Sequence, residues 1–140
     1  MVDFIYGILS SIGYNEPIHP VATHIPMGTI LGGFLFAIAS LKWNALEKTA
    51  YHCLVLALLN MPITISFGIL DWLHGYHGKL IPFIIAKLCL AVAITLFIGV
   101  TVYLYHKGNR EKKVFVPLYG LCFATAIALG FIGGKLVFGG

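Results

Sequence analysis

Four stretches of this chain are almost wholly apolar and are separated by short polar connections. They cover roughly residues 24–41, 49–73, 81–105 and 114–132. About twenty such residues in a helix cross the hydrocarbon core of a bilayer. Because helices joined by short loops pack as antiparallel neighbours, the sequence predicts an all-α integral membrane protein. We expect one domain over residues 1–140, an antiparallel bundle of four transmembrane helices.

The composition supports a chain whose solvent is membrane lipid. Hydrophobic residues make up 59% of it and charged residues 10%, with a mean hydropathy of +0.94. A soluble domain carries about 25% charged residues. The three cysteines lie in apolar runs without a CxxC pair, which argues against a disulfide framework, an iron–sulfur centre or c-type haem attachment. The net charge of +4 comes mainly from two short loops, so we expect no nucleic-acid partner.

The first residues have the pattern of an amphipathic helix rather than of a signal peptide. No basic segment precedes the apolar stretch, and Gly7 and Gly13 interrupt it. Helical spacing relates Val2, Ile5, Ile8, Leu9 and Ile12. We therefore predict a short N-terminal helix that lies in the membrane interface.

The distribution of basic residues predicts the orientation. The connections after the first and third apolar stretches hold most of them: Lys42, Lys48, Lys107, Arg110, Lys112 and Lys113. The opposite face holds Lys79 and Lys135. Because cytoplasmic loops are enriched in lysine and arginine, we expect a multi-pass protein of a bacterial inner membrane with both termini in the periplasm.

Four of the six histidines are predicted to meet at the outer face. His19 and His24 precede or open the first membrane helix, and His74 and His77 follow the second. Such residues near a membrane often mark function, and imidazole binds haem iron, copper and zinc. The preferred prediction is b-type haem held by His24 together with His74 or His77. His19 ranks next, on an extended segment that Pro20 and Pro26 would order. Interfacial hydrogen bonding is the alternative for each ring.

Two charged residues accompany these histidines. Asp71 either orients a ligand histidine or forms a local cap or ion pair. Lys87 lies about two turns inside the third membrane helix, where it extends to the interface, pairs with Asp71 or meets a haem propionate. The predicted cofactor-binding residues are therefore His24, His74, His77, His19, Asp71 and Lys87, and the four histidines are also the predicted metal ligands.

Three motifs resemble a known family. The opening HPVATHIPMG, the Gly-x-x-Asp-Trp end of the second membrane helix and a Gly-Gly-x-Leu-Val close are carried by His19, Pro20, His24, Pro26, Gly68, Asp71, Trp72, Gly133, Gly134, Leu136 and Val137. In these the chain resembles the small four-helix membrane proteins catalogued as domain of unknown function 2231. The resemblance covers nearly the whole chain. It implies the topology and a further histidine between the second and third membrane helices, but no activity.

Three functions compete at this stage. The first is an electron-transfer subunit of a larger respiratory membrane complex, with b-type haem near the outer face relaying electrons between a periplasmic partner, such as a c-type cytochrome, and the quinone pool. The second is a cofactor-free structural subunit. The third is a copper or zinc transport or sensing protein. Whether the chain is an enzyme stays open, although a non-catalytic subunit is favoured because hydrolase motifs such as GxSxG and HExxH are absent.

Overall fold

A computed structural model describes residues 2–108 and 111–138, and five helices account for most of them. They are α1 (Val2–Ser11), α2 (His19–Ala39), α3 (Leu46–Tyr76), α4 (Pro82–His106) and α5 (Lys112–Phe138). No strand occurs in these two ranges. The predicted all-α fold is confirmed, and a short N-terminal helix precedes the four long ones.

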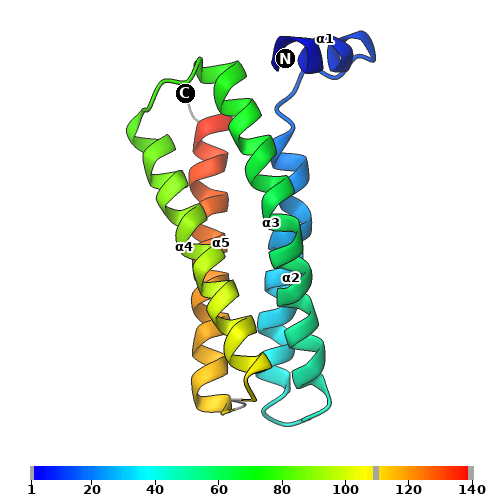
Figure 1. The fold of residues 1–140 in the computed structure, drawn as a ribbon, viewed down its shortest axis with the longest axis vertical. Coiled ribbons are helices and arrows are strands. Elements are labelled where there is room, and N and C mark those ends of the chain that lie inside the picture. Colours follow the sequence, from blue (N-terminus) through cyan, green and yellow to red (C-terminus); the bar gives the residue numbers. More distant parts are fainter. Residues whose placement is uncertain (1, 109–110, 139–140) are drawn as a thin grey trace.

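The four long helices form an up-and-down bundle (Figure 1). Each packs against the next along the chain, and α2 also packs against α5, which closes the ring. Helix α1 lies at one end of the bundle, beside the last turns of α3 (Figure 1). We call this the α1 end. The opposite end, where α2 joins α3 and α4 joins α5, is the two-loop end.

The long helices present an extensive apolar surface that suits contact with lipid. All four are long and apolar enough to cross a membrane. Large side chains on their outer faces are widely exposed, among them Leu59, Val92 and Leu96 at 68%, 61% and 61%. Contiguous apolar patches of this extent are rare on monomeric soluble proteins. The chain is therefore a multi-pass membrane protein in contact with lipid.

The interior is filled by small and branched side chains at close helix contacts. Ile30, Leu54 and Ile98 are fully buried. A Cβ added to Gly33 would lie 3.3 Å from Cys53 Cβ and 3.5 Å from the carbonyl oxygen of Ala50. The missing side chain thus lets α2 approach α3 closely, as small residues do in membrane bundles.

The helix boundaries differ from the prediction mainly at the start of α2. The apolar pattern placed this start near residue 24, and His19 was expected on an extended segment. That expectation is wrong, because α2 begins at His19 with Pro20 in its first turn, where proline is tolerated. Pro26 lies inside α2 and cannot donate to the carbonyl of Ala22. Thr64 Oγ1 of α3 donates to that carbonyl across 3.5 Å.

The basic residues gather at the two-loop end as predicted. Lys42 lies in the α2–α3 connection and Lys48 in the first turn of α3. Lys107 lies in the α4–α5 connection, and Lys112 and Lys113 begin α5. Arg110, which was counted with them, lies outside the described residues. The side of the membrane that this end faces stays a prediction.

Candidate functional site

Asp71 joins three segments at the α1 end. It lies five residues before the end of α3. Its Oδ1 accepts hydrogen bonds from the backbone N–H of Ile18 at 3.1 Å and from the hydroxyl of Tyr6, and its Oδ2 accepts one from the N–H of His19 at 2.9 Å. Ile18 and His19 are the N-cap and first residue of α2. Asp71 therefore caps the N-terminus of α2 from a neighbouring helix. The helix dipole also stabilises a negative charge at that position.

Tyr6 attaches α1 to the end of α3. Besides the hydrogen bond to Asp71, its ring stacks on that of His74, with centroids 3.8 Å apart and planes at 4°. Burial, and then the hydrogen bond to Asp71, raise the pKa of the Tyr6 hydroxyl above its ordinary value. Tyr6 thus stays a protonated donor at neutral pH, so that α1 and α2 share one carboxylate on α3.

The His19 ring is held against α3. Its Nδ1 lies 2.9 Å from the carbonyl oxygen of Thr64. Because a carbonyl only accepts hydrogen bonds, Nδ1 carries the proton, and the neutral ring keeps its lone pair on Nε2. A Cβ added to Gly68 would lie 3.0 Å from that Nδ1, so glycine at this position leaves the space that the ring fills.

Lys87 brings a positive charge near this group from α4. Its side chain is half-buried and interacts electrostatically with His19 and Asp71. The Nζ atom lies 3.9 Å from where a Cβ of Gly133 on α5 would be. Lys87 therefore faces α5 and forms no close ion pair with Asp71 in the part of the chain that the structure describes.

His24 lies apart from the other predicted histidines. His24 is exposed and stands about 140° around α2 from His19, at 3.6 residues per turn. Thr64 lies beside Ala22, so His24 is level with the middle of α3, about 18 Å from His74 along the bundle at 1.5 Å per residue. The fold therefore does not bring together the preferred pair of His24 with His74.

His77 ends α3. It is exposed, its φ of 49° lies in the left-handed region, and its N–H donates to the carbonyl of Trp72. This is the common geometry of a helix C-cap, so the backbone of His77 has a structural role that the sequence pattern did not indicate.

A three-ligand metal site is not assembled among the described residues. In residues 2–108 and 111–138, no three histidine, cysteine, aspartate or glutamate side chains lie together in a metal-binding arrangement. The predicted set of His19, His24, His74 and His77 therefore gains no geometric support as a copper or zinc site.

Sequence reasoning missed two contributors to the site. Tyr6 belongs to the α1 helix that was predicted only to lie on the membrane, and Thr64 contributes through its backbone carbonyl, which has no sequence signal. Gly68 was named only as part of the Gly-x-x-Asp-Trp motif. It precedes Asp71 by three residues, and this spacing places both on the same face of α3.

Fold and site together define a class: a four-span helical membrane protein whose polar contacts gather where a carboxylate of α3 holds the start of α2. No family model matches the chain, and no curated protein or solved structure is found to be similar to it. The resemblance to the family catalogued as domain of unknown function 2231 therefore stays a prediction.

Proposed function

We propose that this protein is an electron-transfer subunit of a membrane respiratory complex, and that His19 would bind b-type haem at the α1 end. The observation that carries this proposal is the contact between His19 Nδ1 and the carbonyl oxygen of Thr64 at 2.9 Å. Histidines that bind metals almost always donate their other ring N–H to a carbonyl or carboxylate, which fixes the ring and frees the second nitrogen.

The surrounding residues fit a haem ligand of this kind. Asp71 fixes the backbone of His19, and Gly68 leaves room for its ring. Lys87 provides a cation near His19, where it would offset the charge of a propionate. Bound haem would supply a one-electron carrier. In this proposal His19 replaces His24 as the first ligand, and His74 and His77, at the same end of the bundle, are the candidates for the second.

The cellular setting belongs to the same proposal. The lysines at the two-loop end favour a cytoplasmic location for that end, which would place His19 near the periplasm of a bacterial inner membrane. A periplasmic donor, such as a c-type cytochrome, would then meet the α1 end. Quinone in the bilayer would be the other redox partner.

The test is a reduced-minus-oxidised visible spectrum with a pyridine haemochrome assay, on protein purified from cells supplied with haem. We expect a b-type α-band in the wild type and its loss in His19→Ala. Added imidazole should restore binding to His19→Gly, which a merely structural role would not produce. His52→Ala, in the other half of α3, is the matched control and should keep its haem. A haem-free wild type, or full haem content in His19→Ala, would show the proposal to be wrong.

A second candidate, a cofactor-free structural subunit, is favoured by the hydrogen bonds of Asp71. One carboxylate ties α1, α2 and α3 together, and this is sufficient reason for the polar residues without any ligand. Under this alternative, Asp71→Ala and His19→Ala would both lower the yield of the assembled complex. Neither variant would change a spectrum, because the wild type would have none.

A further inference from the structure

The two-loop end carries an open depression between α3 and α4. It has a volume of about 700 Å³ and is lined by Asn44, Ala45, Glu47, Lys48, Tyr51 and Tyr105. This volume lies within the range of sites that bind small molecules. The rings of Tyr51 and Tyr105 stack with centroids 4.3 Å apart and give the depression an aromatic wall.

Aromatic and basic side chains place this depression at the level of lipid headgroups. The ammonium of Lys42 lies 5.1 Å from the ring centroid of Trp43, and that of Lys107 lies 5.6 Å from the centroid of Tyr103. Trp43 and Tyr103 are exposed at 56% and 59%. Exposed tryptophan and tyrosine beside lysine are typical of the boundary between hydrocarbon and water.

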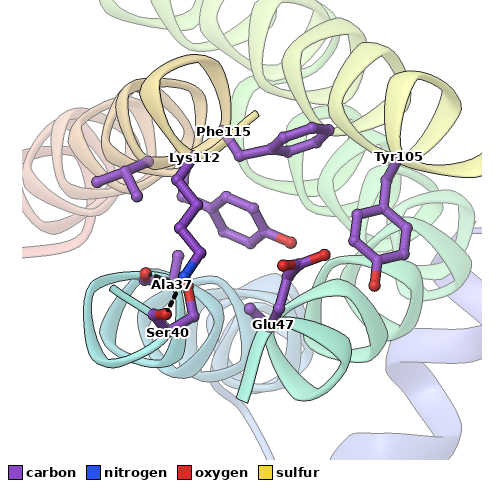
Figure 2. Close-up of a pocket in the computed structure, with 9 residues that line it drawn as sticks. Ala37, Ser40, Glu47, Tyr105, Lys112 and Phe115 are labelled. Atoms are coloured by element: carbon purple, nitrogen blue, oxygen red, sulfur yellow. Dashed lines mark hydrogen bonds between the residues drawn. The ribbon is translucent and has the colours of Figure 1, made fainter. Parts of the chain in front are cut away.

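Among the described residues that line the depression, one carries each charge: Glu47 and Lys48. Lys112 lies in the adjacent pocket that Figure 2 draws, where its ammonium donates to the carbonyl of Ser40 at 2.6 Å and not to Glu47. It also donates to Asn44 Oδ1. Glu47 is half-buried and Lys48 is exposed. Within residues 2–108 and 111–138, no cation forms an ion pair with Glu47. A partly buried carboxylate is favoured when a cation or hydrogen-bond donor accompanies it.

We propose that this depression binds the phosphoethanolamine headgroup of a phospholipid in the leaflet that meets the two-loop end. Lys48 and the amide N–H groups of Asn44 would bind the phosphate, and Glu47 would accept hydrogen bonds from the ammonium. A glycerol headgroup offers Glu47 no cation. Choline carries a cation that cannot donate a hydrogen bond. The proposal is independent of haem binding.

The experiment measures the lipid retained by the full chain after transfer from nanodiscs, by native mass spectrometry. The nanodiscs contain equal fractions of phosphatidylethanolamine, phosphatidylglycerol and phosphatidylcholine. We expect about a fivefold preference for phosphatidylethanolamine, in the range of one charge-assisted hydrogen bond at a partly exposed site. Glu47→Gln should remove this preference, and Lys48→Gln should weaken retention of both phosphatidylethanolamine and phosphatidylglycerol about fivefold.

Controls separate binding from folding. Lys79→Gln, at the α1 end, should behave as the wild type, and Lys48→Arg should keep most of the binding. Because Lys48 is exposed, its variants test the site even where Glu47→Gln fails to fold. Equal retention of the three lipids by the wild type, a preference for phosphatidylglycerol, or unchanged retention in Lys48→Gln would overturn the proposal.

Discussion

Replacing Asp71 by alanine tests how the α1 end is held together. The substitution removes the acceptor for the N–H groups of Ile18 and His19 and for the Tyr6 hydroxyl. A hydrogen bond to a charged group contributes about 1.5–3 kcal/mol, and loss of a helix cap alone costs about 1 kcal/mol. Because Asp71 is only half-buried and the three bonds share one side chain, we expect a loss of about 2–4 kcal/mol in unfolding free energy.

Tyr6→Phe is the matched variant. It removes one of the three hydrogen bonds and keeps the ring that stacks on His74. We expect it to cost about 1 kcal/mol. The backbone N–H groups at the start of α2 keep their acceptor in this variant, so the effect should be confined to α1.

Two measurements distinguish the variants. Reversible unfolding in mixed detergent micelles gives the free energies, and hydrogen exchange gives the location of the change. Asp71→Ala should speed exchange in α1 and in the first turn of α2, whereas Tyr6→Phe should speed it in α1 alone. Equal losses in the two variants, or an unchanged exchange rate at His19 in Asp71→Ala, would refute the capping role of Asp71.

Two further predictions concern the same end. Gly68→Ala should lower the free energy of unfolding by about 1–3 kcal/mol, because the new Cβ would lie 3.0 Å from the His19 ring. The control is Gly75→Ala, whose new Cβ would meet open space. It should not lower stability in the same unfolding assay. The pKa of Tyr6 is raised in the folded protein. The protonated hydroxyl therefore contributes its full stabilisation to the fold below the ordinary tyrosine pKa of about 10, and this contribution is lost as the pH rises above that value. Between about pH 8 and pH 11 the wild type should lose more stability than Tyr6→Phe, and equal losses would contradict this role of the hydroxyl.

The bundle itself could be predicted because lipid imposes its requirements on sequence directly. Each apolar run had to be long enough to cross the bilayer. Helices α3 and α4 occupy the runs predicted near 49–73 and 81–105, and their ends differ from the predicted ones by a few residues. Ends move in this way because polar residues such as His74 continue a helix into the headgroup region without changing the hydropathy of its centre.

The start of α2 could not be predicted from the chain around it. Local reasoning from Pro20 and Pro26 favoured an extended segment at His19. What extends the helix to His19 is Asp71, which is 52 residues away in sequence and supplies the missing cap. The residue that determines where α2 begins therefore lies on α3. It can be identified only when the register of α2 against α3 is known.

The role of Asp71 was ambiguous for the same reason. A carboxylate on the helix next to a histidine can act in two ways: it can orient a ligand ring, or it can cap the backbone of the histidine's helix. In the structure, the Asp71 carboxylate accepts a hydrogen bond from the backbone N–H of His19, and the His19 ring is hydrogen-bonded to the carbonyl of Thr64. That division depends on how closely α2 approaches α3, which Gly68 permits.

This division also decides how experiments on the site should be interpreted. Because Asp71 fixes the segment that carries His19, its removal would disturb any ligand bound by His19 without Asp71 touching that ligand. Loss of haem in Asp71→Ala would therefore not identify a haem-binding residue, whereas recovery of His19→Gly by imidazole would. The number of histidines at the α1 end is likewise no measure of the number of ligands, since the backbone of His77 caps α3 and the ring of His74 stacks on Tyr6.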